Sequence, residues 1–194
     1  MDRKDKYYTR AKKEKYRSRA AFKLIEIEKK YNIMGKDNYI LEFGSSPGGW
    51  TQIIKEYTAL PVVSVDLNRM APLDNVIFIQ GNINDISLYD KINEIMVSNN
   101  IKSFNTILSD AMVKTSGNGE RDHYRSYELC ENVMELSVDL LSKNGNMLLK
   151  QFQGDMTDEF LNGWKSNFNF YKITKPHASR AHSKEIYIIF KNKH

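Results

Sequence analysis

Apolar and polar positions alternate in blocks along most of the chain. Short and nearly continuous apolar runs occupy residues 38–43, 61–66, 75–79, 104–109 and 145–151. Stretches with helical spacing of apolar positions lie between or beside these runs, at 49–58, 88–99 and 123–142. Strands that are buried on both faces have continuous apolar runs, and strands that alternate with helices form parallel sheets. The pattern therefore predicts an α/β fold with a mostly parallel sheet and helices on both faces.

The two ends of the chain follow other patterns. Residues 15–31 carry apolar side chains at helical spacing among charges, which predicts an amphipathic helix before the first strand. After a short predicted helix at 157–165, two more apolar runs, 168–174 and 185–190, are joined by a loop without a helix. Antiparallel strands can be joined in this way, whereas parallel strands need a longer crossover. We expect one domain over residues 1–194, with seven strands, of which the last is antiparallel.

The turn after the first predicted strand carries a ligand-binding pattern. Residues 41–52 read LEFGSSPGGWTQ, so an apolar run ends at Gly44 and a glycine-rich turn leads into a helix. Such a turn forms the nucleotide-sized crevice of open α/β sheets. The spacing differs from the G-x-G-x-x-G of dinucleotide sites, and it suits the amino-acid part of S-adenosylmethionine better. One glycine alone would suit any strand-to-helix turn, but Gly44, Pro47, Gly48 and Gly49 together favour a ligand site.

Asp66 ends the second apolar run, about 20 residues after the glycine turn, where a carboxylate binds ribose hydroxyls in this architecture. In isolation, Asp66 would be an ordinary turn or helix-capping aspartate. After this particular turn, it is predicted to bind a ribose.

The distribution of charge predicts a polyanionic partner. The formal net charge is +5, and residues 1–30 hold 12 Lys and Arg against 5 Asp and Glu, whereas the rest of the chain holds 17 against 19. A confined basic surplus is typical of a phosphate-binding face. The chain is rich in lysine throughout, but general enrichment would not confine the surplus to one end. Asp2, Asp5 and Glu14 interrupt the basic segment, which argues against a transit peptide.

Other compositional features exclude several classes of protein. Cys130 is the single cysteine, so no intramolecular disulfide can form, and we expect an intracellular, reducing compartment. Whether that compartment is mitochondrial, cytoplasmic or nucleolar stays open. The four histidines show no ligand spacing, so no metal is expected. No apolar run is long enough to span a membrane.

Six ordered segments, which extend across nearly the whole chain, resemble the FtsJ/RrmJ-type RNA 2′-O-methyltransferases. They are KYRSRAAFKL (15–24), LEFGSSPGGWTQ (41–52), VSVDL (63–67), ILSD (107–110), LLKQFQG (148–154) and KPHASRAHSKEIYI (175–188). The resemblance implies a Rossmann-like, S-adenosylmethionine-dependent methyltransferase fold with a seven-stranded sheet.

The resemblance also implies a catalytic Lys-Asp-Lys-Glu tetrad, which falls on Lys23, Asp110, Lys150 and Glu185. Asp110 and Lys150 lie near the carboxyl ends of predicted parallel strands, where active sites of open sheets gather. A lysine inside an apolar strand also needs a carboxylate partner. Lys23 and Glu185 would otherwise be taken for ordinary surface residues. We expect Lys150 to act either as a base or as an electrostatic clamp on the reacting oxygen.

For the cofactor, the expected contacts are Gly44, Ser45, Pro47, Gly48 and Trp50 around the methionine, Asp66 at the ribose, Leu67 at the adenine, and Asn82, Ile83 and Asp110 nearby. Two segments depart from the family pattern. Asn82 stands where relatives often carry Asp, and its side-chain carbonyl can still accept a hydrogen bond from the adenine. Ala111-Met112-Val113 stands where many relatives have Met-Ala-Pro.

The expected RNA-phosphate contacts are Lys4, Lys6, Arg10, Lys12, Lys13, Arg17, Arg19, Arg180 and Lys184. The leading hypothesis is 2′-O-methylation of a ribose in large-subunit ribosomal RNA, with uridine as the expected base. The alternatives are methylation of a tRNA anticodon-loop ribose, a non-catalytic ribosome-assembly factor, and, more distantly, an NAD-dependent oxidoreductase.

Overall fold

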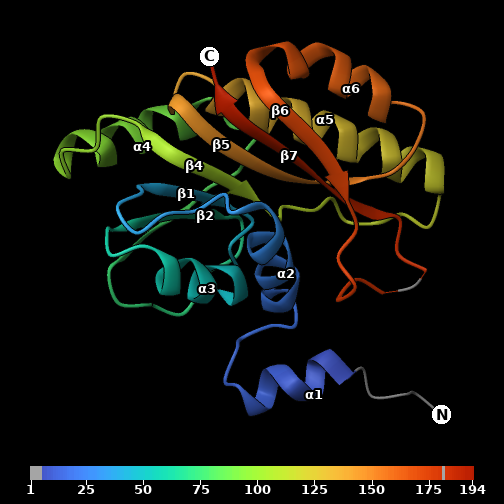
Figure 1. Cartoon of the computed structure of the whole chain (residues 1–194), viewed down its shortest axis with the longest axis horizontal. Helices are drawn as coiled ribbons and strands as arrows, with labels where there is room; N and C mark the ends of the chain where they lie inside the picture. The colour runs from blue at the N-terminus through green and yellow to red at the C-terminus, as the bar shows by residue number, and fades with distance from the viewer. Residues whose placement is uncertain (1–5, 181) are drawn as a thin grey trace.

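Seven strands form one mixed sheet at the centre of the molecule, in the order β3-β2-β1-β4-β5-β7-β6 (Figure 1). The computed structural model describes residues 6–180 and 182–194. The strands are β1 (Ile40–Phe43), β2 (Val62–Asp66), β3 (Val76–Gln80), β4 (Phe104–Ser109), β5 (Leu141–Phe152), β6 (Phe168–Thr174) and β7 (Glu185–Lys193). β7 pairs antiparallel with both β5 and β6, and β1 to β5 pair in parallel. The predicted fold class is therefore confirmed.

Helices cover both faces of the sheet (Figure 1). They are α1 (Lys6–Lys13), α2 (Ala21–Tyr31), α3 (Gly49–Tyr57), α4 (Ser87–Ser98), α5 (Gly119–Ser137) and α6 (Thr157–Trp164). One apolar cluster joins α4, α5 and α6 to the sheet, and a second joins α2 and α3 to the other face. The short helix α1 lies beyond α2, on the side away from the sheet (Figure 1).

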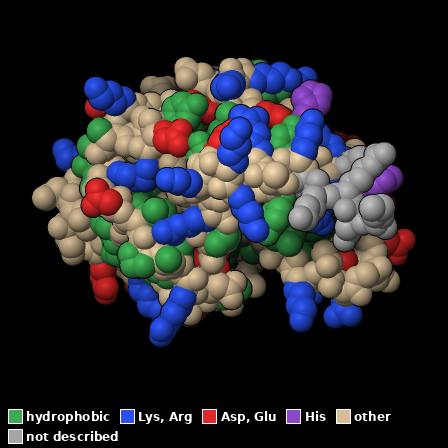
Figure 2. Space-filling view, turned by 90° about the horizontal axis from the view of Figure 1, so that it is seen from below, with side chains coloured by type: hydrophobic (Ala, Val, Ile, Leu, Met, Phe, Trp, Pro, Cys, Tyr) green, Lys and Arg blue, Asp and Glu red, His purple; other side chains and the backbone are tan. Residues whose placement is uncertain are grey.

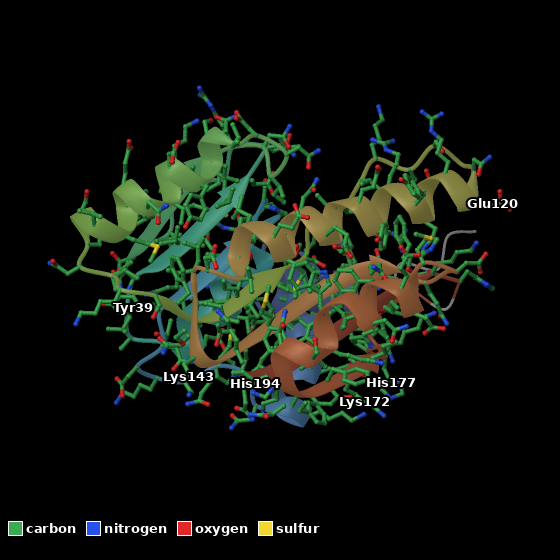
Figure 3. All side chains as sticks on the ribbon, turned by 90° about the horizontal axis from the view of Figure 1, so that it is seen from above. Tyr39, Glu120, Lys143, Lys172, His177 and His194 are labelled. Carbon is green, nitrogen blue, oxygen red and sulfur yellow. The ribbon has the colours of Figure 1, made fainter. Side chains whose placement is uncertain are left out.

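The strand order places a crevice at the carboxyl ends of the strands. From β1 the chain passes outward to β2 and β3, and then returns to β4 on the other side of β1. Ligands of open α/β sheets bind at such a reversal, outside the carboxyl ends of the strands. In Figure 3, Tyr39 lies near the amino end of β1, and Lys143 lies near the amino end of the paired part of β5. Both residues lie far from Glu120, which is in the first turn of α5.

Two of the predicted helices have wrong boundaries. The helix predicted at 15–31 begins at Ala21, because the backbone N–H of Arg17 and the C=O of Lys15 bond to the Gln52 side chain instead of to a helix. The helix predicted at 123–142 begins at Gly119 and ends at Ser137, and β5 starts at Leu141. Asn118 caps its start, because its side-chain oxygen accepts hydrogen bonds from the backbone N–H groups of Glu120 and Arg121. Apolar periodicity carries no signal for either contact.

Candidate active site

Two ion pairs meet above the carboxyl ends of β4 and β5. Lys23 Nζ lies 2.7 Å from Glu185 Oε2, and Lys150 Nζ lies 3.1 Å from Asp110 Oδ1. Lys150 also donates to the main-chain oxygen of Asp110 at 2.6 Å. Both lysines are buried, with exposed fractions of 8% for Lys23 and 7% for Lys150. A buried ammonium is tolerated when it is paired and hydrogen-bonded, and each lysine meets that condition.

Strand register explains why residues so distant in sequence meet. Lys150 on β5 lies directly opposite Tyr187 on β7, and Phe152 lies opposite Glu185. Glu185 therefore lies two residues from Tyr187 and on the same face of the sheet as Lys150. Helix α2 packs on this face and contributes Lys23.

Tyr187 links the two ion pairs, and the motif comparison did not single it out. Its hydroxyl donates to Asp110 Oδ1 at 3.0 Å, and its ring centroid lies 5.6 Å from Lys23 Nζ. Its side chain is fully buried. Burial raises the pKa of Tyr187 well above its ordinary value, and the nearby Asp110 carboxylate raises it further. Tyr187 is therefore a fixed hydrogen-bond donor that orients the carboxylate.

Glu185 keeps its charge in this setting. Burial tends to raise the pKa of the Glu185 carboxyl, but the charge and hydrogen bond of Lys23, together with the charge of Lys150, lower it below its ordinary value. Glu185 therefore stays ionised beside the two lysines.

A cavity of about 350 Å³ opens beside Asp110 and Lys150. Of the predicted cofactor contacts, those that line it are Gly44, Asp66, Leu67, Asn82, Ile83 and Asp110. Gly44 has φ +75°, and a Cβ there would lie 2.4 Å from the Ala111 nitrogen, so only glycine fits between the strand end and this loop.

Ser45, Pro47, Gly48 and Trp50 do not line this cavity. Trp50 is buried beneath the sheet, where its indole N–H donates to Ala20 O and its ring lies 5.8 Å from that of Tyr187. The predicted contact of Trp50 with the methionine stays a prediction, and the first turn of α3 directs its ring away from the cavity. The cavity lining that the motifs missed comprises Ser46, Val65, Asn68, Gly81, Ala111, Met112, Leu129 and Lys150, the last predicted only as catalytic.

The Asp66 carboxylate joins the two loops that wall the cavity. Oδ2 accepts from the Ser46 backbone N–H at 2.8 Å, and Oδ1 accepts from the Asn68 backbone N–H at 2.7 Å. Each carboxylate oxygen can accept a further hydrogen bond, so Asp66 can still bind ribose hydroxyls.

A second cavity, of about 480 Å³, adjoins the other side of the tetrad. Its lining includes Arg19, Lys23, Met112, Arg180, His182 and Glu185. Asp110 and Lys150 line the first cavity, Lys23 and Glu185 line the second, and Met112 lines both. The four charged side chains therefore lie where two pockets meet, which is an arrangement suited to transfer between two bound molecules.

Basic side chains surround the second cavity and extend over α1. Figure 2 shows Lys and Arg side chains spread across the face of the molecule that carries α1. Lys6, Lys12 and Lys13 on α1 are exposed. Arg10 is also exposed, pairs with Glu14 at 2.6 Å and lies over the Phe22 ring. Lys184 is exposed in the loop before β7, and Lys4 lies outside the described residues.

Arg17 and Arg19 have partners within the protein. Arg17 donates to three main-chain oxygens, those of Pro47, Ala71 and Pro72. Arg19 donates to Ala178 O at 2.5 Å and still lines the second cavity. Burial lowers the pKa of Arg19, and the nearby charge of Arg180 lowers it further. Two guanidinium groups that repel each other at a cavity mouth favour an anionic ligand there.

No group of three or more His, Cys, Asp or Glu side chains could hold a metal ion within residues 6–180 and 182–194. Every helix in these same ranges is too short or too polar to cross a lipid bilayer. Cys130 is buried, and burial raises the pKa of its thiol to about 12.

Comparison with known proteins identifies close relatives over the full length. A family profile of FtsJ-like methyltransferases matches residues 16–193. A protein from Picrophilus torridus named ribosomal RNA large subunit methyltransferase E is 58% identical over 193 residues, which cover 100% of each chain. A protein of the same name from Thermoplasma acidophilum is 43% identical over 97% of this chain and 92% of its own length.

Solved structures agree with this assignment. A crystal structure described provisionally as a ribosomal RNA methyltransferase from Plasmodium falciparum superposes with a TM-score of 0.80 and 34% identity, and covers 92% of this chain and 98% of that one. A Streptococcus mutans protein in complex with SAH (S-adenosylhomocysteine), described provisionally as a methyltransferase, has a TM-score of 0.55 at 9% identity. It covers 83% of this chain and 90% of its own, and shows likeness of fold alone.

Proposed function

The chain belongs to the FtsJ-like methyltransferase family and is an RNA methyltransferase, and from this premise we propose that it methylates the 2′-hydroxyl of a ribose in large-subunit ribosomal RNA. The observation that carries the proposal is the position of the tetrad between two cavities, with the glycine turn and Asp66 on one side and arginines on the other.

The first cavity suits S-adenosylmethionine. Asp66 offers carboxylate oxygens for ribose hydroxyls, and Leu67, which is 62% exposed, offers an apolar surface for the adenine. Asn82 and Ile83 line the cavity beyond Leu67 and are placed to contact the same ring. Close to the glycine turn, Ser45 Oγ and Glu42 Oε1 are buried without a hydrogen-bond partner among the described residues.

S-adenosylmethionine, when bound, would supply a methyl group on a positively charged sulfur. The sulfur–methyl bond would break as the bond to the 2′-oxygen forms, and the hydroxyl proton would pass to solvent water. The protein must therefore orient the hydroxyl and stabilise the charge that develops on its oxygen. Lys150 is suited to this task because the main-chain oxygen of Asp110 accepts a hydrogen bond from its Nζ, and the Asp110 carboxylate forms an ion pair with it. Both contacts of its Nζ are with oxygen acceptors, to which an ammonium donates, so we assign Lys150 to charge stabilisation rather than to proton abstraction.

Lys23 holds a second positive charge at the acceptor side. Glu185 fixes its Nζ at 2.7 Å, and the pair lines the second cavity, where we place the acceptor nucleotide. Arg19 and Arg180 at this cavity would contact its phosphates. Lys6, Arg10, Lys12, Lys13 and Lys184 would hold flanking RNA by charge, with little dependence on base sequence.

Methylation of a tRNA anticodon-loop ribose is the second candidate. The basic segment before α2 favours it no less than ribosomal RNA, because phosphate contacts do not distinguish the two. The names of the relatives favour ribosomal RNA. Uridine as the base is an expectation from the family resemblance alone.

The test is methyl incorporation by the purified protein with S-adenosylmethionine and one of three substrates: intact large ribosomal subunits, deproteinised ribosomal RNA, or tRNA. Mass spectrometry of the digested RNA should find a 2′-O-methyl nucleoside from ribosomal RNA and none with the Lys150→Met protein. Methylation confined to tRNA would establish the second candidate. A methyl group on a base would refute ribose chemistry, and no incorporation into any RNA would favour a non-catalytic assembly factor.

A further inference from the structure

We propose that Arg17 and Ser18, in the basic segment before α2, are positioning residues of the cofactor site, and that Arg17 is not a phosphate ligand. The inference rests on the proposed use of S-adenosylmethionine in the first cavity. In this inference, the basic segment before α2 shapes the pocket that binds the methyl donor.

Arg17 joins the two loops that form the cavity walls. Its Nη1 donates to Ala71 O at 2.6 Å and to Pro47 O at 3.3 Å, and its Nη2 donates to Pro72 O at 2.9 Å. Pro47 follows Ser46 in the glycine turn, and Ala71 and Pro72 follow the wall residues Leu67 and Asn68. The planar guanidinium can bond several acceptors in fixed directions at once, which a lysine ammonium on a flexible stem does not reproduce.

The backbone around Arg17 is fixed as well. Its N–H donates to Gln52 Oε1 at 2.7 Å, and Gln52 Nε2 donates to Lys15 O at 3.1 Å. Gln52 lies in α3, the helix that the glycine turn opens. Together with Asp66, which bonds the backbone of Ser46 and Asn68 from inside the cavity, Arg17 holds the same two loops from outside.

The glycines of the turn make room for this segment. A Cβ at Gly48 would lie 2.8 Å from Arg17 Nη1, and a Cβ at Gly49 would lie 2.0 Å from Ser18 Oγ. From the sequence we expected these glycines to form part of a ligand site. The space that a side chain would fill at each of them is occupied by residues 17 and 18, and neither glycine lines the first cavity.

The first test distinguishes a positioning role of Arg17 from a phosphate contact by keeping the positive charge of its side chain. Arg17→Lys retains a cation for RNA but loses the forked set of hydrogen bonds. Calorimetry without RNA should show S-adenosylmethionine binding weakened about tenfold, the size expected when one charge-assisted hydrogen bond is lost. The Michaelis constant for the donor should rise while kcat at saturating donor stays near wild type. The salt dependence of binding to a labelled stem-loop RNA should not change.

Lys13→Gln, which removes an exposed charge from the same basic segment, is the matched control and should leave donor binding unaltered.

The second test uses a compensating pair. Gly49→Ala should weaken donor binding because the new methyl meets Ser18 Oγ. Adding Ser18→Gly removes both Oγ and the Cβ at 3.1 Å, and should restore much of the affinity. Gly49 lies at the start of α3 without a positive φ, so alanine is compatible with its backbone.

The results of these tests distinguish failure of the inference from failure of the proposed function. Wild-type donor affinity in Arg17→Lys, or no restoration in the Gly49→Ala/Ser18→Gly pair, would overturn the inference. It would also be overturned if the melting temperature of the ligand-free Arg17→Lys protein fell far below that of Lys13→Gln, since Arg17 would then support the whole fold. If the wild-type protein itself binds no S-adenosylmethionine, the proposed function fails first, and the inference fails with it.

Discussion

At the scale of single residues, the site depends on how buried charges are balanced. Lys150 is held by the side chain and the main-chain oxygen of one residue, Asp110, whose Oδ1 also accepts from Tyr187. Removing one member of such a network leaves the others without partners, and this costs more than the bond itself. The consequences for chemistry and for stability can therefore be measured separately.

Replacement of Lys150 should affect the chemical step. Lys150→Met should lower kcat by at least about 100-fold, which is the usual effect of losing a group that stabilises a developing oxyanion. Binding of S-adenosylmethionine, measured by calorimetry, should stay nearly intact because Asp66 and the glycine turn are unchanged. Lys172→Met removes an exposed lysine from β6 and is the matched control.

Lys150→Arg distinguishes the two roles for this position. Arginine keeps the positive charge but cannot take up a proton at physiological pH. Residual activity well above that of Lys150→Met supports charge stabilisation, and equal loss in both variants would contradict it. Wild-type turnover by Lys150→Met would remove the residue from the site altogether.

Glu42 predicts a dependence of stability on pH. Its side chain is fully buried in β1, and burial raises the pKa of its carboxyl to about 7, although Thr51 and Ser64 donate hydrogen bonds to Oε2. The folded protein therefore keeps this proton at pH values where the unfolded chain has lost it. The Glu42 contribution to the free energy of unfolding should decrease as pH rises from about 4.5 to about 7, and then level off.

Glu42→Gln is neutral at every pH and can still accept both hydroxyl hydrogen bonds. In urea denaturation, its stability relative to wild type should increase between about pH 5 and about pH 8, by up to about 3 kcal/mol. A buried amide without a partner lowers stability equally at each pH, so only the change with pH is diagnostic. Parallel curves for the two proteins would show that Glu42 ionises at its ordinary pKa.

At the scale of elements, α1 is attached through few contacts and carries mostly exposed side chains. Ala11 is its one buried residue, and it packs with Phe22 and Ala178. Charges on such a helix can be changed with little effect on the sheet. They are therefore suited to a test of RNA binding that does not alter the active site.

Reversal of Lys6, Lys12 and Lys13 to Glu should weaken RNA binding and flatten its salt dependence. Each lost phosphate contact on a single strand reduces the slope of log K against log salt by about 0.7, so three contacts change it by about 2. Filter binding over a range of salt concentrations measures this slope. The control reverses three lysines elsewhere, Lys91, Lys102 and Lys143, and should change it less. An unchanged slope in the α1 variant would exclude this helix from the RNA interface.

The sequence was a good guide to elements and a weaker guide to their contacts. All seven strands were predicted, and the apolar runs over β1, β2 and β4 are continuous because these strands are buried on both faces. The start of α2 was wrong because Lys15 and Arg17 bond to Gln52, a partner 35 residues or more away. The direction of the Trp50 ring was not predictable for a related reason. The direction of a helix relative to the sheet sets where its first side chain points, and periodicity does not encode that direction.

At the scale of the whole molecule, the motifs identified the four tetrad residues, and the fold brings them together through strand register and the packing of α2. Tyr187 was not singled out, and Met112 was noted only as a departure from the family pattern, because neither residue type is chemically distinctive in a sequence. Their importance comes from position: Tyr187 lies opposite Lys150, and Met112 lies between two cavities. The resemblance to a family supplied the tetrad, and only the three-dimensional arrangement shows which pocket each member faces.

The contact of residues 17 and 18 with the glycine turn limits how this enzyme could be re-engineered. A designer who grafts a foreign N-terminal segment onto the sheet, in order to redirect methylation to another transcript, also replaces the side chains lodged above Gly48 and Gly49. Chimeras should therefore exchange the first turn of α3 together with the N-terminal segment, so that the side chains of the new segment fit against the turn.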